Sequence, residues 1–199
     1  MARQRHPAVA REGWPLITLA VIATAAAWFF ESQLTLLAGA LAFALVFKFR
    51  DPERIIPSEP LGVVSPVDGI VELVETVPDP ALNRTAVRIR IRVSFFGAYS
   101  GRAPVEGKVL DLAGPRGMRL QTDEGDDVIL YINTAPGFAC PKSIVGYGSR
   151  VGQGQRCGWL RLARVAEVYL PADAHISVAP GRRVLAGADL LGVLTHPSA

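Results

Sequence analysis

The sequence predicts a mainly β domain preceded by an N-terminal pair of apolar α-helices. Within residues 14–47 the only charged side chain is Glu31. The rest of the chain consists mostly of short β-rich runs separated by glycine and proline, without helical periodicity. We therefore expect two domains: residues 1–50, a basic tail with a helical hairpin, and residues 51–199, a β domain.

The apolar N-terminal region is expected to form a membrane hairpin. Two uncharged stretches, residues 14–30 and 34–47, are separated by Glu31-Ser32-Gln33. A straight helix needs about 20 apolar residues to cross a bilayer core, so both stretches are short. Basic residues flank both outer ends, which places the termini and the β domain on the cytoplasmic side of the inner membrane. A soluble helical hairpin, a cleaved signal peptide and one long tilted helix are the alternatives.

The charge distribution favours a membrane surface over nucleic acid as a partner. The net charge is +3, and basic residues flank the apolar region: Arg3, Arg5, Arg11, Lys48, Arg50 and Arg54. Basic residues interleaved with aromatic residues do not form a stripe elsewhere, so no nucleic-acid binding is expected. Cys140 and Cys157 lack metal or redox spacing, so we expect small buried thiols and no metal site.

Four runs are expected to be strands, namely residues 63–64, 70–74, 87–93 and 128–132. The third run alternates strictly. This places Val87, Ile89, Ile91 and Val93 on one face and Arg88, Arg90 and Arg92 on the other.

Two internal repeats refine the fold. Pro66-Val67-Asp68-Gly69-Ile70-Val71 is echoed by Pro104-Val105-Glu106-Gly107-Lys108-Val109, and Gly148-x-x-Val151-x-x-Gly154 is echoed by Gly181-x-x-Val184-x-x-Gly187. In the second pair, glycines supply turn conformations and the central valine points to the core, as in a lipoyl-like hairpin. We therefore expect a barrel-sandwich hybrid, with two interleaved halves related by a pseudo-twofold axis.

Four phrases occur in order: Phe49-Arg50-Asp51-Pro52-Glu53-Arg54, Ser65-Pro66-Val67-Asp68-Gly69, Arg102-Ala103-Pro104-Val105-Glu106-Gly107 and Val168-Tyr169-Leu170-Pro171. Together they resemble the short bacterial phosphatidylserine decarboxylases, which are pyruvoyl-dependent enzymes of phospholipid biosynthesis. The resemblance covers nearly the whole chain and implies the same β fold and a carboxy-lyase (lyase) ancestry.

The resemblance also implies a self-cleavage site, where a serine preceded by glycine becomes the pyruvoyl group. Counting back from Val168-Tyr169-Leu170-Pro171, that pair falls on Ala163-Arg164. Arginine has no hydroxyl group and cannot yield a pyruvoyl group. The chain is therefore expected to lack the family's usual maturation site.

Of two further positions that the family uses in its chemistry, one is matched in this chain and the other is not. Asp68 matches an aspartate that takes part in maturation, although an aspartate before glycine is also ordinary turn chemistry. Tyr99 falls where the family has histidine, and a phenol with a pKa of about 10 is a poor proton shuttle near neutrality. A family segment between Val109 and Val128 is shortened here to a turn around residues 114–118.

A displaced cleavage site is the alternative. Tyr147-Gly148-Ser149-Arg150-Val151 resembles the family's cleavage phrase Phe-Gly-Ser-Arg-Val but lies well upstream of Tyr169. It is either a coincidental hairpin turn or a moved site at Gly148-Ser149.

The leading hypothesis is a membrane protein of phospholipid metabolism, related to phosphatidylserine decarboxylase, without self-maturation, decarboxylase activity or a cofactor. Expected partners are membrane phospholipid, a second copy or an active decarboxylase. Candidate head-group contacts are Arg88, Arg90, Arg92 and Arg102, although a solvated strand face explains the first three equally well. An active pyruvoyl enzyme maturing at Gly148-Ser149 is one alternative, and a membrane-tethered lipoyl-like adaptor or lipid-binding module is another.

Overall fold

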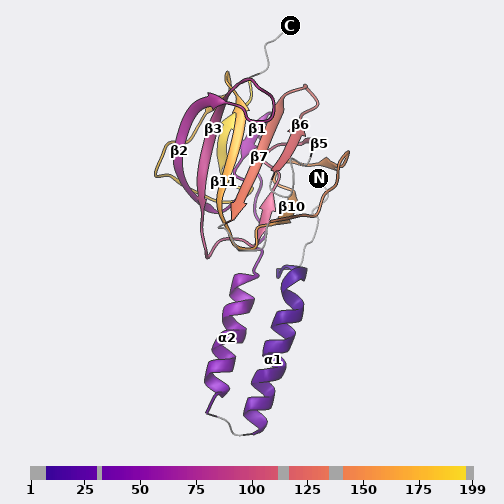
Figure 1. The fold of residues 1–199 in the computed structure, drawn as a ribbon, viewed down its shortest axis with the longest axis vertical. Helices are drawn as coiled ribbons and strands as arrows, with labels where there is room; N and C mark the ends of the chain where they lie inside the picture. Colours follow the sequence, from indigo (N-terminus) through magenta and orange to yellow (C-terminus); the bar gives the residue numbers. More distant parts are fainter. Residues whose placement is uncertain (1–7, 31–32, 112–116, 135–140, 196–199) are drawn as a thin grey trace. The chain divides into compact units, whose positions relative to one another are not determined.

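The computed structural model describes residues 8–30, 33–111, 117–134 and 141–195. The chain divides into two compact units, Met1–Glu53 and Arg54–Ala199. The first unit is helical and the second is built from β-strands (Figure 1).

The first unit contains a short 3-10 turn, η1 (Arg11–Gly13), followed by α1 (Trp14–Phe29) and α2 (Thr35–Lys48). The helices run side by side, and a Cβ added to Gly39 of α2 would lie 3.8 Å from Thr24 Cγ2 of α1. The expected helical hairpin is therefore present, although Glu31 and Ser32 lie outside the described residues.

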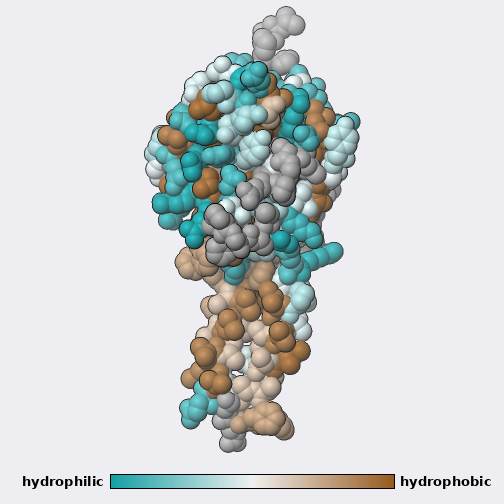
Figure 2. Space-filling view, viewed as in Figure 1, coloured by the Kyte–Doolittle hydropathy of each residue, from teal (hydrophilic) through white to brown (hydrophobic). Residues whose placement is uncertain are grey.

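Nearly all apolar side chains of these helices are exposed, as the brown helical surface in Figure 2 shows. Leu36, for example, is 87% exposed, and Ala20 is the one buried residue among the described residues of α1 and α2. The stretch Arg11–Phe29 is long and apolar enough to cross a membrane by length and composition, whereas α2 is shorter.

The second unit contains the strands β1 (Gly62–Val64), β2 (Gly69–Pro78), β3 (Thr85–Val93), β4 (Ser100–Arg102), β5 (Gly107–Asp111), β6 (Gly117–Gln121), β7 (Asp127–Thr134), β8 (Lys142–Ser143), β9 (Arg150–Val151), β10 (Arg156–Trp159), β11 (Ala163–Pro171), β12 (His175–Ile176), β13 (Arg183–Val184) and β14 (Leu190–Val193). An eight-stranded sheet has the order β13-β2-β3-β11-β7-β6-β5-β9. Two three-stranded sheets have the orders β1-β14-β12 and β4-β10-β8. All described strand pairs are antiparallel, and the mainly β prediction is confirmed.

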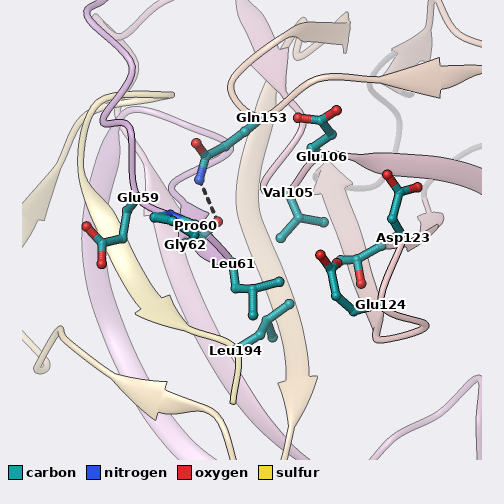
Figure 3. Close-up of a pocket in the computed structure, with 11 residues that line it drawn as sticks. Glu59, Pro60, Leu61, Gly62, Val105, Glu106, Asp123, Glu124, Gln153 and Leu194 are labelled. Atoms are coloured by element: carbon teal, nitrogen blue, oxygen red, sulfur yellow. Dashed lines mark hydrogen bonds between the residues drawn. The ribbon is translucent and has the colours of Figure 1, made fainter. Parts of the chain in front are cut away.

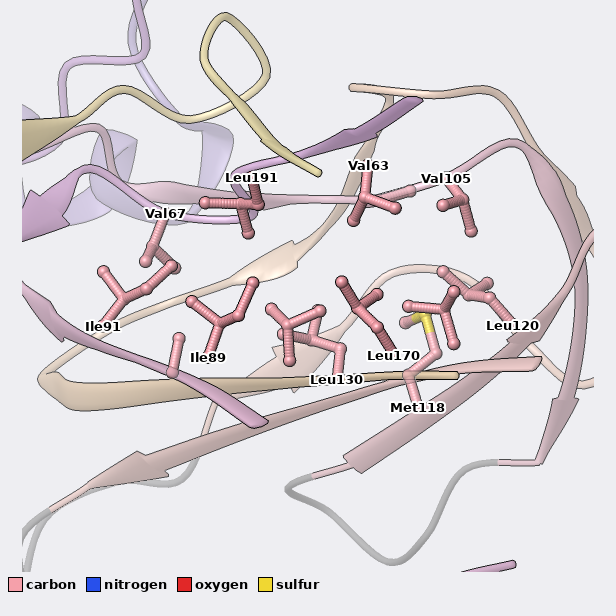
Figure 4. Packing of buried hydrophobic residues seen from close by; sticks show 14 of the residues in the cluster. Val63, Val67, Ile89, Ile91, Val105, Met118, Leu120, Leu130, Leu170 and Leu191 are labelled. Carbon is pink, nitrogen blue, oxygen red and sulfur yellow. The ribbon is translucent and has the colours of Figure 1, made fainter. Parts of the chain in front are cut away.

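The alternation expected for residues 87–93 appears in β3, where Ile89 and Ile91 are fully buried while Arg92 is exposed. The buried side chains of β3 pack with those of β7, β11 and β14 in one core (Figure 4). Ile89, Leu130 and Leu170 all belong to this core. The core forms because period-2 patterning puts the apolar residues of neighbouring strands on the same face.

The glycine repeats make equivalent hydrogen bonds. The amide of Gly148 donates to Val109 O (2.8 Å), and the amide of Gly181 donates to Val71 O (2.8 Å). In the first repeat, Val64 N donates to Pro104 O (2.8 Å), and reciprocally Arg102 N donates to Pro66 O (2.9 Å). Each half of the domain thus repeats the pairing of the other.

Candidate functional site

Asp68 is a buried acceptor in the bend directly before β2, with a relative exposure of 6%. Its Oδ1 accepts a hydrogen bond from Ala186 N (2.7 Å), and its Oδ2 accepts from Ala98 N (2.8 Å). The guanidinium of Arg54 donates to Oδ2 as well (3.1 Å). The carboxylate therefore ties together three segments that are distant in sequence.

Tyr99 follows one of these donors and is also buried, at 7% exposure. Its ring lies 5.9 Å from that of Trp159, and its carbonyl oxygen accepts from Leu160 N (2.9 Å). Leu160 O in turn accepts from Ala163 N (2.9 Å). The structure thus brings the segments of Asp68, Tyr99 and Ala163 into one region of the domain.

Ala163 and Arg164 begin β11 at an irregularity. The pairing with β7 shifts register between Ala163 and Val165, so Arg164 occupies the extra position of a bulge. Its side chain is exposed. A bulge at this point aims Arg164 away from the ladder and into a cleft.

The cleft has a volume of about 600 Å³, and we call it the arginine cleft. Its lining residues are Glu72, Arg90, Arg92, Val93, Phe95, Leu162, Ala163, Arg164 and Val165. Three guanidinium groups and one carboxylate line it, an excess of two formal positive charges. The remaining lining side chains are apolar.

Ion pairs cross the strands beside the cleft. Glu72 Oε2 lies 3.7 Å from Arg90 Nε, and its Oε1 lies 3.6 Å from Arg92 Nε. Glu167 pairs with Arg90 at 3.8 Å and with Arg88 at 3.9 Å. Exposed pairs of this kind contribute at most about 1 kcal/mol each, so they can exchange partners.

Comparisons with known proteins decide the family. A family model described as phosphatidylserine decarboxylase matches residues 41–124. The chain is 36% identical over 219 residues to a phosphatidylserine decarboxylase proenzyme of Symbiobacterium thermophilum, covering 98% of this chain and 99% of the relative. It is 34% identical over 212 residues to a proenzyme of the same description from Burkholderia ambifaria strain MC40-6, covering 95% and 97%.

The chain belongs to the phosphatidylserine decarboxylase family. Among solved structures, glucose permease IIA from Mycoplasma capricolum matches with a TM-score of 0.50 and 18% identity, covering 68% of this chain and 96% of that one. That likeness concerns the fold alone.

The family's pyruvoyl group does not fit the residues at its usual position. The group is made from a serine, and Arg164 offers no hydroxyl there. By the sequence resemblance, Ala163 falls where the family has the preceding glycine, and Tyr99, whose ring is buried, falls where the family has histidine.

Ser149 lies in a different setting from these decarboxylase-family positions. It sits in the turn before β9, where Gly148 has a positive φ of 78°. Ser149 Oγ accepts from Gly146 N (3.3 Å), and Ser149 O accepts from Val109 N (2.9 Å). Among the described residues, Ser149 and Asp68 share no hydrogen-bond partner.

Two of the proposed head-group arginines lie outside the arginine cleft. Arg102 is 5% exposed, and its Nη1 donates to Gly154 O (3.1 Å). This placement corrects the expectation for Arg102, because a buried guanidinium cannot reach a lipid head group. Arg88 pairs with Glu75 and Glu167 farther along β3.

A second hollow of about 300 Å³ carries the opposite charge (Figure 3). We call it the acidic hollow, and its carboxylates are Glu59, Glu106, Asp123 and Glu124. Gln153 Nε2 donates to Gly62 O (2.6 Å) at its edge. Arg150 pairs with both Glu106 and Asp123. No metal-binding group of His, Cys, Asp or Glu occurs among the described residues.

Cys157 offers no nucleophile for a decarboxylase-like reaction. It is buried, and burial raises the pKa of its thiol to about 12, so the thiol stays neutral at physiological pH. Cys140 lies outside the described residues.

Sequence reasoning missed Glu72, Phe95 and Leu162, which complete the arginine cleft. One signal was available. Phe95 and Phe96 lie one residue beyond the end of β3, and two adjacent aromatic residues after a strand indicate an exposed apolar tip.

Proposed function

We propose that this chain is a membrane-bound member of phospholipid metabolism that neither cleaves itself nor decarboxylates phosphatidylserine. The observation that carries the proposal is the exposed Arg164 at the bulge where the family has its cleavage serine. Self-cleavage needs a hydroxyl group at this position to attack the preceding carbonyl. The guanidinium of Arg164 is permanently protonated and is no nucleophile.

The side chains that could transfer protons, Tyr99 and Asp68, also favour a chain without decarboxylase activity. A general acid or base needs a pKa near the working pH and reach to the reacting atom. Tyr99 has a phenol of high reference pKa, and its ring is buried against Trp159. Asp68 remains, but three donors hold its carboxylate within the scaffold.

The proposal places the chain in the inner membrane through a hairpin of α1 and α2, with the β domain on the cytoplasmic side. The exposed apolar helices and the basic flanking residues support this placement. For the β domain we propose a barrel-sandwich hybrid with lipoyl-like hairpins. The equivalent hydrogen bonds of Gly148 and Gly181 support it.

An active decarboxylase maturing at Gly148-Ser149 is the second candidate. Two observations favour it. The relatives described above are named proenzymes, and the sequence around Ser149 resembles the family's cleavage phrase. Against it, the contacts of Ser149 and Asp68 involve separate segments.

Intact mass of the purified full chain tests the proposal. We expect one species near 21.3 kDa and no release of carbon dioxide from phosphatidylserine. Ser149→Ala is the matched control, since it removes the other hydroxyl in a family-like phrase and is expected to leave the mass pattern unchanged. Two fragments divided between Gly148 and Ser149, and abolished by Ser149→Ala, would establish the second candidate instead.

A further inference from the structure

We infer that the hairpin of α1 and α2 crosses the bilayer completely and matches a hydrocarbon core of about 21–24 Å, thinner than the ordinary core. The acyl chains around the helices are its partner, and short chains match it better than long ones. This inference rests on the membrane placement in the proposed function. It goes beyond that placement by assigning the depth of the hairpin, the position of its tip and the lipids that it prefers.

The base of the hairpin is closed, so that both helices have one end at the same level. Ala10 N donates to Phe49 O (2.9 Å), and Val9 and Arg50 form an antiparallel β-bridge. A Cβ added to Gly13 would lie 2.3 Å from Phe49 Cγ, so this ring packs directly beside the start of α1. Neither helix can therefore slide along the other. A chain that crosses the bilayer through α1 must return through α2.

The helices are short for a bilayer. α1 has 16 residues and α2 has 14, which at a rise of about 1.5 Å per residue gives about 24 Å and about 21 Å. The hydrocarbon core of a bilayer is about 30 Å thick, so the hairpin falls short by about 6–9 Å. Local thinning of the bilayer removes such a mismatch at a modest cost in free energy.

The tip of the hairpin, meaning residues 28–30 and 33–34, contains polar groups that require water. Gln33 is exposed there, and the sequence between the helices also contains the carboxylate of Glu31. The end of α1 and the beginning of α2 lie at the tip, and helix ends carry backbone groups without partners inside the helix. Hydrocarbon solvates neither a charge nor such backbone groups. The tip therefore reaches the aqueous face opposite the base.

Aromatic side chains mark both ends of the hairpin. Trp14 begins α1 at the base and is 58% exposed, whereas Trp28 and Phe29 at the tip are 76% and 80% exposed. Lys48 ends α2 at the base. Tryptophan gathers at both interfaces of a membrane, and lysine and arginine gather on the cytoplasmic side. One aromatic belt at each end fits a hairpin that reaches both interfaces.

Labelling from one side of the membrane tests the crossing. The full chain carries Cys140→Ser together with either Gln33→Cys at the tip or Lys108→Cys, which is exposed on β5. Cys157 is kept, because it is buried and its thiol stays neutral. A membrane-impermeant maleimide is added to intact spheroplasts and to disrupted membranes. We expect Gln33→Cys to react in intact spheroplasts and Lys108→Cys, the matched control, to react only after disruption.

The outcomes separate the inference from the proposed function. Reaction of both positions from the same side, or protection of Gln33→Cys even after disruption, would overturn the crossing. Reaction of Lys108→Cys alone in intact spheroplasts, with Gln33→Cys reacting after disruption, would support the crossing and reverse the proposed orientation. Intact mass tests the loss of self-cleavage independently, so failure of the crossing leaves that part of the proposed function standing.

Lipid selection tests the short length. Trp159→Phe leaves Trp14 and Trp28, both in the hairpin, as the only tryptophans of the full chain. In vesicles, brominated dioleoyl phosphatidylcholine quenches their fluorescence, and a second lipid that displaces it restores the signal. We expect dimyristoleoyl phosphatidylcholine, which has short chains, to displace it at least about twofold better than dierucoyl phosphatidylcholine, which has long chains.

A lengthened hairpin is the matched variant for this measurement. Four leucines, about 6 Å of helix, are inserted into each helix at the same level, between Leu19 and Ala20 and between Ala42 and Phe43. The variant should lose the preference for short chains. Equal displacement by both lipids in the chain with the native hairpin, or an unchanged preference after lengthening, would overturn the assigned length.

Discussion

At the scale of single residues, Asp68 and Arg164 have different physical roles. Asp68 accepts hydrogen bonds from Ala98 and Ala186 and pairs with Arg54, so its charge is part of the packing of the domain. Arg164 is exposed and contributes little to that packing. Asp68 is therefore under a folding demand that does not apply to position 164.

Asp68→Asn tests this folding role. Hydrogen bonds to a charged acceptor contribute about 1.5–3 kcal/mol each, and the amide turns one donor group toward neighbouring donors. We expect the free energy of unfolding to fall by about 2–4 kcal/mol, measured by denaturant titration of the detergent-solubilised chain.

The control is Asp123→Asn, whose side chain is 63% exposed in its pair with Arg150. It should change the same quantity by less than about 1 kcal/mol. Equal effects of the two variants would show that Asp68 does not hold the segments together.

At the scale of elements, the strands that open each repeat approach a neighbouring strand too closely for a side chain. A Cβ on Gly69 at the start of β2 would lie 2.2 Å from Arg92 O, and one on Gly107 at the start of β5 would lie 2.2 Å from Gln121 O. The two halves therefore need glycine at equivalent positions, because the backbones cross there.

Gly107→Ala is expected to lower the free energy of unfolding by about 3 kcal/mol or more, since backbone atoms must move. Gly148→Ala adds a Cβ in open space at a φ of 78° and should cost only about 1–2 kcal/mol of conformational strain. Thermal melting of both variants measures the difference. A larger loss for Gly148→Ala would mean that turn conformation, and not close approach, limits the fold.

At the scale of the whole molecule, self-cleavage depends on groups from several segments. By the sequence resemblance, the cleavage pair falls at the start of β11 and the family's histidine position directly before β4, and Asp68 directly precedes β2. A substitution in one segment therefore leaves the groups of the other two segments unchanged.

The double variant Ala163→Gly/Arg164→Ser is expected to remain one chain near 21.3 kDa, because Tyr99 still occupies the histidine position. Intact mass after prolonged incubation checks this, with the unaltered chain as reference. Cleavage of the double variant would show that position 99 is dispensable for maturation.

The sequence predicted the helices and the alternation in β3 because both depend on local patterning. It did not predict the arginine cleft, whose lining comes from β2, β3, the residues after β3 and the start of β11. Long-range pairing brings these segments together, and no local pattern encodes that register. The burial of Arg102 was not predicted for a related reason. Every residue of the short strand β4 is buried, and no local pattern indicates this.

The three donors around Asp68 bear on how sequences of this family are sorted. A survey that scored Ser-Pro-x-Asp-Gly as a mark of enzymatic competence would count this chain among the competent ones. In this chain the aspartate has a structural role in joining three segments, so its presence does not by itself indicate activity. Exposed residues that contribute little to packing, such as Arg164, are better indicators of chemistry than a buried carboxylate that holds segments together.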